Sequence, residues 1–474
     1  MKRILLFCIP ALLFTASCSD LDDYNVDPKS AVIVPGETLV TNAQRNLVRT
    51  VTSSSVNLNP FRFYVQHWAG TTYADESQYD INTRAINRFF WDALYRDVLR
   101  DLQEAKTIIT ANTVLTDEVK NNQLAEIEVM EVYTWSVLVN TFGDVPYTEA
   151  LDYNIVQPKF DDDAAIYSDL LTRLDAAIAM FDGSASSFGS ADLIYGGNVK
   201  RWMMFANSLK LRMALTIADA DAAKAQTMAT QAAPLVFTSN ADNADVTFLA
   251  STPNSNPLWE DLVQSGRQDF RAADTFINAL NTLNDPRRNE FFKPLADGTF
   301  KGAVYGTLNS SAGFSAPGTL LEDPEFPGVL LSYSEVEFLL AEAVERGFAV
   351  GGTAMAHYNS AITASILEWG GTTAEATAYL AQPSVNYATA TGEWRRKIGV
   401  QKWIALYNQP VEGWKEWRRL DAPNLVKPSD AKSEIPLRLT YPITEQNLNK
   451  AGYTAASKAI GGDVVTSKIF WDVR

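Results

Sequence analysis

The sequence predicts a predominantly α-helical protein, an all-α fold of irregular helical hairpins interrupted by one loop-rich region. Two observations lead to this prediction. Apolar residues recur at helical spacing in pairs of segments that are joined by short loops. The region from about 240 to 328 lacks this spacing and is rich in Asn, Ser, Gly and Pro. Because no Pro- or Gly-rich linker divides the chain, residues 18–474 are expected to form a single domain.

Residues 1–17 have the features of a signal peptide. Lys2 and Arg3 precede an apolar run over residues 4–14, which is shorter than the ~20 residues that a membrane-spanning helix needs. Small residues then lead to Cys18, whose thiol can accept a thioether-linked lipid. We therefore expect a protein that is anchored to a membrane by acyl chains such as palmitate and is not inserted in it.

The segment around Cys18 resembles a bacterial lipobox, with one departure. Thr15 stands where that motif usually has Leu. The alternative is an ordinary secretory signal in which the cysteine has no role. Asp20, Asp22 and Asp23 follow, and such acidic tracts resemble signals that send lipoproteins to the outer face of an outer membrane. A solvated linker is the alternative for this tract.

The composition fits an extracytoplasmic globule. Of the 474 residues, 46% are hydrophobic and 11% aromatic, so the chain can bury a large core. A net charge of −16, without any run of basic residues, argues against a nucleic-acid partner. The two cysteines are Cys8, which would leave with the signal peptide, and Cys18. The mature chain is thus expected to keep no thiol for a disulfide, a metal or a nucleophile.

Residues 20–60 are expected to form an extended tether that includes a short helix near 40–51. The helical hairpins follow this segment. One face of the next helix is formed by apolar residues three, four or seven positions apart, namely Trp91, Leu94, Tyr95, Val98, Leu102, Ala105 and Ile109. Thr116 is placed to cap the helix after it, and Gly143 to end that helix ahead of Pro146. These two helices form the first predicted hairpin.

Two more helical pairs are predicted downstream, 166–181 with 200–218 and 334–346 with 353–367, and a further helix spans 397–407. In the third pair Ala354, Tyr358 and Ala361 match the A-x3-[FY]-x2-A pattern of a tetratricopeptide helix. Uneven spacing of the pairs indicates an irregular tetratricopeptide-like scaffold.

Eight segments, taken together and in order, resemble a known family. They are TFGDVPYTEA (141–150), KRWMMFANSLKLRMAL (200–215), DPRR (285–288), SYSEVEFLLAEAVERG (332–347), YNSAITASILEWG (358–370), IGVQKWIALYNQPVEGWKEWRRL (398–420), IPLRLTYPITEQNLN (435–449) and KIFWD (468–472). The chain resembles the SusD/RagB lipoproteins, in the SusD-like branch with a tetratricopeptide-type helical core. The resemblance covers essentially the whole mature chain.

This resemblance implies a surface-exposed nutrient-binding lipoprotein of a Gram-negative outer membrane. Such proteins sit on a SusC-like TonB-dependent transporter and deliver glycans, or sometimes peptides, to it. No cofactor is expected. It leaves starch, host glycan, plant polysaccharide and peptide open as ligands.

Aromatic residues at helical spacing are interpreted as core, with arginines stacked on tryptophan faces; these are Trp403, Tyr407, Trp414, Trp417, Arg418 and Arg419. Loop aromatics are the better candidates for a ligand, because a flat ring supplies apolar area to a sugar at low entropy cost. Trp68, Tyr73 and Tyr79 lie in one stretch without helical spacing, and Trp259 and Arg267 lie in the long insertion. The alternative is that each of these residues only anchors its loop.

An enzyme is not expected. The only histidines, His67 and His357, are far apart and have no cysteine partner, which disfavours a zinc site or a histidine-based triad. Pro317 replaces the final glycine of a G-x-S-x-G pattern over 313–317. The acids at 161–163 lack the spacing of a calcium loop. A surface glycoside hydrolase and a structural or adhesive lipoprotein remain the alternatives.

Overall fold

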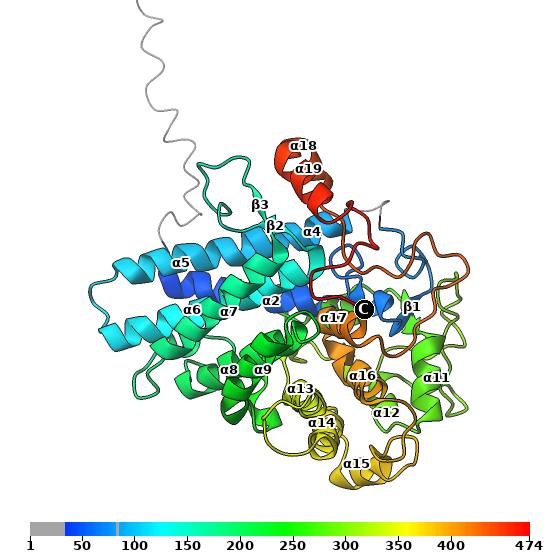
Figure 1. Cartoon of the computed structure of the whole chain (residues 1–474). Coiled ribbons are helices and arrows are strands. Elements are labelled where there is room, and N and C mark those ends of the chain that lie inside the picture. The colour runs from blue at the N-terminus through cyan, green and yellow to red at the C-terminus, as the bar shows by residue number, and fades with distance from the viewer. Residues whose placement is uncertain (1–33, 82–84) are drawn as a thin grey trace, which may run out of the picture.

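The computed structural model describes residues 34–81 and 85–474, and its fold is α-helical, as predicted (Figure 1). Strands in these ranges form only three two-stranded antiparallel ribbons, β1–β5, β2–β3 and β4–β6. The signal peptide, the lipidation site and the acidic tract lie outside the described residues. Among the helices of the described part, none is both long and apolar enough to cross a bilayer.

The N-terminal half is built around α2, whose buried face lies against α5 and β6. Its elements are α2 (Gly36–Thr52), α3 (Phe61–Tyr64), β1 (Trp68–Gly70), α4 (Ile86–Leu94), the π-helical η2 (Tyr95–Leu99), α5 (Arg100–Ala111), α6 (Asp117–Phe142), β2 (Val145–Pro146), β3 (Phe160–Asp161), α7 (Asp163–Met180), η3 (Gly189–Ala191), α8 (Val199–Thr216), α9 (Ala222–Ala232) and η4 (Ala233–Leu235). The first helix is longer than expected and belongs to the core, whereas the sequence suggested a short helix on a tether.

The first predicted hairpin is present as α4–η2–α5 followed by α6. The apolar residues predicted on one face are buried except for Tyr95, which is only half-buried. The extra residue in the π-helical turn rotates the following turns, so that Leu99 is buried as well. The Thr116 hydroxyl accepts a hydrogen bond from the Val119 amide, and Gly143 ends α6 with a φ of 79°. Both boundary predictions are confirmed.

The C-terminal half adds the remaining helices. They are η5 (Asn240–Asp242), α10 (Pro257–Trp259), the π-helical η6 (Glu260–Gln264), α11 (Asp274–Thr282), α12 (Arg288–Phe291), η7 (Thr319–Glu322), α13 (Tyr333–Glu345), α14 (Ala354–Glu368), α15 (Thr373–Leu380), α16 (Trp394–Ala405), η8 (Leu406–Asn408), α17 (Pro410–Leu420), α18 (Ile443–Leu448) and α19 (Lys450–Ala459), with strands β4 (Ala244–Val246), β5 (Phe270–Ala272) and β6 (Gly328–Leu331). The predicted pairs are confirmed, since α7 packs on α8 and α13 on α14.

The region from 240 to 328 is more structured than its composition suggested. It contains α11, whose buried residues Phe276, Ile277 and Leu280 provide too few turns for the helical spacing to stand out. Its strands β4 and β5 pair with strands that lie elsewhere in the chain, β6 and β1. These pairings tie the insertion into the scaffold.

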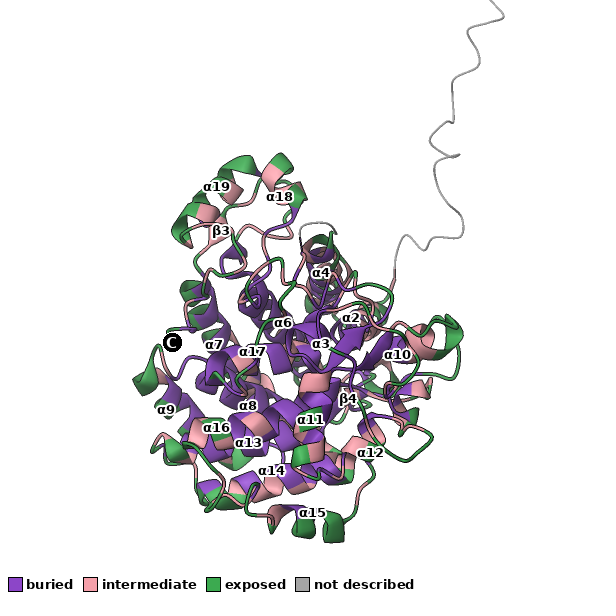
Figure 2. Cartoon of the chain, turned by 90° about the vertical axis from the view of Figure 1, so that its right-hand side faces the viewer, coloured by how far each residue is buried: buried purple, intermediate pink, exposed green. Residues whose placement is uncertain are grey.

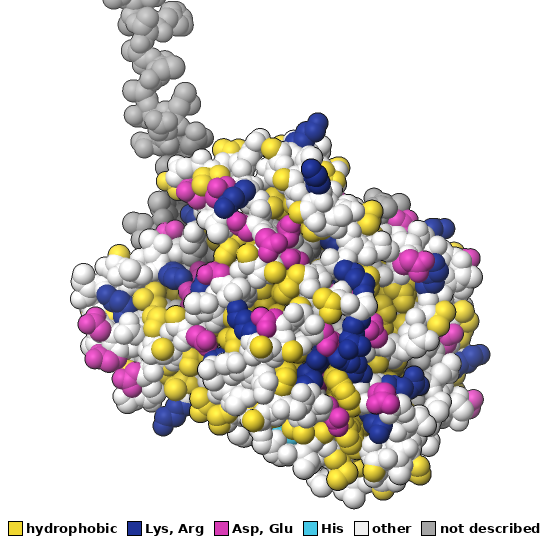
Figure 3. Space-filling model, viewed as in Figure 1, with side chains coloured by type: hydrophobic (Ala, Val, Ile, Leu, Met, Phe, Trp, Pro, Cys, Tyr) yellow, Lys and Arg dark blue, Asp and Glu magenta, His cyan; other side chains and the backbone are white. Residues whose placement is uncertain are grey.

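The buried apolar side chains form one large cluster and a smaller one that includes residues of α13, α14 and α15, while α15, α18 and α19 on the periphery are largely exposed (Figure 2). Trp403, Tyr407 and Trp414 are buried, and the Arg418 guanidinium lies 3.7 Å from the centre of the Trp414 ring. The core interpretation of these aromatics is therefore confirmed. On the face shown in Figure 3, acidic and basic side chains are interspersed with polar and apolar ones.

Candidate functional site

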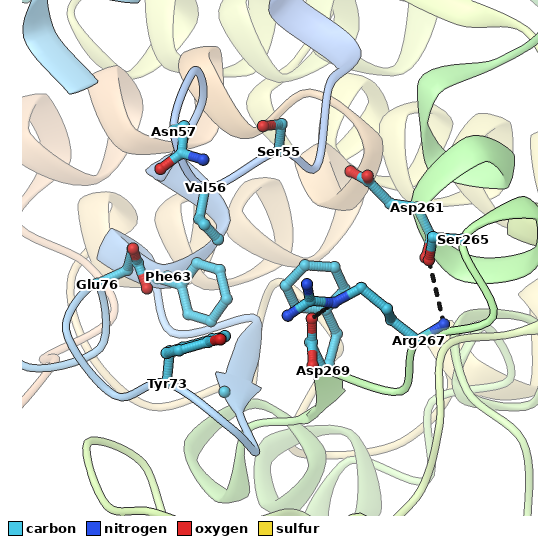
Figure 4. A pocket seen from close by; sticks show the side chains of 12 residues that line it. Ser55, Val56, Asn57, Phe63, Tyr73, Glu76, Asp261, Ser265, Arg267 and Asp269 are labelled. Carbon is cyan, nitrogen blue, oxygen red and sulfur yellow. Dashed lines mark hydrogen bonds and ion pairs between the residues drawn. The ribbon is translucent and has the colours of Figure 1, made fainter. Parts of the chain in front are cut away.

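A surface cavity of about 410 Å³ lies where the β1–β5 ribbon meets the loop after α2. This volume is within the ~300–1,000 Å³ that is usual for small-molecule sites. Its lining combines aromatic, polar and charged side chains (Figure 4), from Ser55, Val56, Asn57, Phe63, Gly70, Tyr73, Glu76, Asp261, Ser265, Arg267, Asp269 and Phe270.

The β1–β5 ribbon brings two distant parts of the sequence into this cavity. Gly70 at the end of β1 pairs with Phe270 at the start of β5. The pairing continues beyond the strands, because the Thr71 amide donates to the Asp269 carbonyl (2.9 Å) and the Thr72 hydroxyl to the Asp269 carboxylate (3.0 Å). Residues that follow β1 therefore lie beside residues that precede β5.

Gly70 allows a tight turn that sets the position of Tyr73. A Cβ atom on Gly70 would lie 2.0 Å from the carbonyl oxygen of Tyr73, a distance that no real contact of this kind reaches. Only glycine lets the chain fold back so closely after β1. The turn leaves Tyr73 48% exposed at the cavity, whereas Phe63 and Phe270, which also line the cavity, are buried.

Tyr73 and Arg267 lie together at the cavity. The Arg267 guanidinium is 5.7 Å from the centre of the Tyr73 ring and forms an ion pair with Asp269. The hydrogen bond to Asp269, and a weaker one to Tyr73, raise the pKa of Arg267, which is therefore charged at any physiological pH. The pair presents an aromatic face next to a planar donor group.

Carboxylates occupy the other walls. Glu76 is 3% exposed and comes from the loop after β1, and Asp261 comes from η6. Burial raises the pKa of Asp261, although the Ser54 hydroxyl donates a 2.8 Å hydrogen bond to its carboxylate. The cavity is thus lined by carboxylates from two separate segments of the chain (Figure 4).

The structure separates the five predicted ligand residues into three groups. Tyr73 and Arg267 line the cavity. Trp68 and Tyr79 are fully buried: the Trp68 indole donates to the Tyr407 hydroxyl (2.7 Å), and the Tyr79 hydroxyl accepts from Gln66 (3.0 Å). Both therefore anchor their loop in the core, the alternative considered from the sequence. Trp259 is half-buried at the end of α10 and does not line the cavity.

Several cavity residues carried no signal in the sequence. Asn57 follows α2, Asp261 lies on a π-helical turn, and Glu76 is one of many acids in the chain. Phe63 and Phe270 resemble ordinary core residues, and they are buried. Only the strand pairing between residues about 200 positions apart groups them.

A second cluster of acids, Asp144, Asp162 and Asp163, brings ligand atoms within 4.8 Å of one another near the end of α6. Each carboxylate already accepts a backbone hydrogen bond, from Asp163, Ala165 and Phe470 respectively. Burial, with the charges of Asp144 and Asp162, raises the pKa of Asp163 to about 6. These contacts give the cluster a structural role in joining α7 to its surroundings.

Fold and cavity together define a helical-repeat protein that presents a ligand-sized surface pocket with an aromatic face. The chain matches the SusD-like family described as "Starch-binding associating with outer membrane" over residues 28–442 and therefore belongs to that family. No protein of curated function matches it.

Solved structures share the fold over nearly the whole chain. A chitin-binding protein is 26% identical, with a TM-score of 0.80, and the alignment covers 93% of this chain and 100% of that one. A SusD homologue from Bacteroides uniformis is also 26% identical, with a TM-score of 0.75 and coverage of 92% and 99%. A chitin-binding SusD homologue from Flavobacterium johnsoniae, 24% identical with a TM-score of 0.78 and coverage of 92% and 99%, supports the fold.

Proposed function

We propose that this protein is a lipid-anchored, cell-surface binding protein that captures a glycan at the Tyr73 cavity and delivers it to a SusC-like TonB-dependent transporter. The observation that carries the proposal is the exposed Tyr73 ring beside polar walls. Membership in a starch-binding family and the likeness to a chitin-binding protein support a glycan over a peptide as ligand.

The cavity suits the chemistry of a sugar ring. One face of a pyranose is apolar and packs on an aromatic ring, whereas its hydroxyl groups need donors and acceptors around the edge. Tyr73 supplies the ring, Arg267 supplies donors, and Asn57, Glu76 and Asp261 supply acceptors. Binding through such contacts requires no covalent step, in keeping with a role in delivery.

The site is tested by isothermal titration with starch and chitin oligosaccharides on Tyr73→Ala, with Tyr153→Ala as a matched control. Tyr153 is 84% exposed and lies outside the cavity. Tyr73→Ala should bind its glycan about fivefold more weakly, because a stacking contact contributes about 1 kcal/mol. Equal affinities of both variants and the wild type would place the site elsewhere.

Delivery and the absence of turnover need separate measurements. The transporter should copurify with the lipidated protein from outer membranes. If the protein purified without any transporter, the delivery role would be contradicted. Because carboxylates line the cavity, a hydrolase is the second candidate. Prolonged incubation of the bound glycan with pure protein should release no new reducing ends, and release that Asp261→Asn abolishes would favour the hydrolase.

A further inference from the structure

We propose that the groove between η5 and the α13–α14 hairpin is a second binding site, for an uncharged sugar unit. The groove has a volume of about 540 Å³, within the ~300–1,000 Å³ that is usual for small-molecule sites. None of its ten lining residues carries a charged side chain, although 20% of the residues of the whole chain are charged. The inference rests on the proposed function for the kind of ligand, but the groove shares no lining residue with the Tyr73 cavity.

The floor of the groove is one side of α14. Asn359, Thr363 and Leu367 follow one another at four-residue spacing and therefore share this side of the helix, with Ser360 beside them. The opposite side of α14, which includes Ile362, is buried and packs on α13 (Figure 1). The helix thus presents short, uncharged polar side chains to a ligand.

Hydrogen bonds fix the segment that covers this side of α14. The Asn240 side-chain amide donates to the carbonyl of Ala364 in α14 (2.9 Å). The side-chain carbonyl of Asn243 accepts from the Tyr333 amide at the start of α13 (2.7 Å). Because both walls are held in place before a ligand arrives, binding costs little conformational entropy.

Charged side chains that are bonded to these walls are neutral or engaged elsewhere. The Asp242 carboxylate accepts from the Ser239 amide (3.0 Å). Arg201 donates to a backbone carbonyl of η5, and its guanidinium lies 4.4 Å from the centre of the Tyr195 ring. Burial raises the pKa of Glu368, at the end of α14, to about 8, so this acid is uncharged at neutral pH. The lining residues therefore offer a ligand donors and acceptors but no ion pair.

An uncharged sugar matches this lining. Tyr333 and Leu367 offer apolar area to the face of a pyranose. The amide of Asn359 and the hydroxyls of Ser360 and Thr363 can exchange hydrogen bonds with the hydroxyls of the sugar. A uronic acid or a protonated amino sugar would lose hydration of its charge without gaining an opposite charge. The groove therefore favours neutral units, such as glucose or N-acetylglucosamine, over charged ones.

The test uses a single reporter thiol, because the expected mature chain has no cysteine besides Cys18. In the mature Cys18→Ala protein, Ala241→Cys places an environment-sensitive fluorophore at the rim of the groove. Val114→Cys, at a position that is 90% exposed outside the groove, is the matched control. Maltoheptaose or chitohexaose should change the emission from position 241 and not from position 114. Oligogalacturonate and glucosamine oligomers should bind at least about fivefold more weakly.

Variants show whether the reporter senses the groove. Thr363→Arg puts a long charged side chain into the groove and should weaken binding measured at position 241 at least about tenfold. Thr110→Arg, the same substitution at an exposed position of α5, is the control and should leave this binding unchanged. Tyr73→Ala should also leave it unchanged, because the two sites share no lining residue. Thermal melting confirms that each variant is folded.

The outcomes separate this inference from the proposed function. If Tyr73→Ala weakens sugar binding in titrations while position 241 gives no response, or gives one that Tyr73→Ala abolishes, the groove inference is wrong and the cavity stands. A stronger response at position 241 to an uncharged peptide of alanine and serine than to either sugar would also overturn the inference. If no sugar binds the wild type and position 241 gives no response, both proposals fail.

Discussion

The indole nitrogen of Trp68 donates a 2.7 Å hydrogen bond to the hydroxyl of Tyr407 inside the core. This bond joins β1 to the turn after α16, and the Trp68 ring also stacks on Phe270 with ring centres 5.1 Å apart. Trp68 therefore holds the strand that leads to Tyr73, although its own side chain is fully buried.

Trp68→Ala should destabilise the protein by about 3–5 kcal/mol, the usual cost of removing a buried large aromatic side chain. Trp68→Phe should lose about 1 kcal/mol through the missing hydrogen bond. Guanidinium unfolding measures both. Tyr73→Ala is the contrast and should change stability by less than about 0.5 kcal/mol. A stable Trp68→Ala variant that has lost glycan binding would mean that Trp68 is a contact residue.

Gly70→Ala should disturb the site more than the fold. The added Cβ would meet the Tyr73 carbonyl oxygen at 2.0 Å, so the turn must open and move the Tyr73 ring. We expect a loss of stability of about 1–3 kcal/mol and clearly weaker glycan binding. Gly183→Ala, whose Cβ would have its nearest neighbour at an ordinary 3.4 Å, is the control for both measurements. Unchanged binding by Gly70→Ala would show that the turn does not position Tyr73.

The two histidines should titrate on opposite sides of the ordinary range. The hydrogen bond between the His357 ring and the Glu337 carboxylate (2.7 Å) raises the pKa of His357. Burial and the charge of Arg62 hold the pKa of His67 well below 6.5. Because the chain has only these two histidines, NMR can follow both rings directly. Glu337→Gln should return the His357 pKa toward 6.5 and leave the His67 ring unaffected.

The stability that each histidine contributes follows from the direction of its shift. The His357–Glu337 pair stabilises the fold fully below about pH 6.5 and loses this effect as pH rises through the raised pKa, a change of about 0.5–1 kcal/mol. The neutral, buried His67 acts in the opposite sense, so stability falls as pH drops below about 6.5. Urea unfolding of the wild type and of His357→Gln at several pH values separates the two effects. If the difference in unfolding free energy between the wild type and His357→Gln did not change with pH, the expected effect of the His357–Glu337 pair would be contradicted.

Cys18→Ala should abolish lipid attachment. We expect the variant to lose palmitate labelling and to leave the membrane fraction, since the acyl chains supply its membrane affinity. Cys8→Ala is the matched control. It removes the other thiol of the chain, which lies in the expected signal peptide, and the variant should remain labelled. Labelling of Cys18→Ala equal to that of the wild type would show that the lipid is attached elsewhere.

Helical periodicity in the sequence determined much of the scaffold. The sequence alone predicted the Thr116 cap, the end of α6 at Gly143 and the hairpin of α13 and α14, because each depends on residues within a few turns of one another. The same holds for the buried aromatics of α16 and α17. Local physics, through capping, periodicity and small-residue packing, is sufficient for these features.

The cavity was decided by the tertiary structure. Tyr73 and Arg267 were recognisable as loop residues, but only the antiparallel pairing of β1 with β5 places them 5.7 Å apart. The same fold buries Trp68 and leaves Tyr73 exposed, although both are aromatics of one short stretch. The physical reason is that burial and proximity depend on strand pairing over some 200 residues, which no local pattern encodes, whereas helix formation depends on neighbours along the chain.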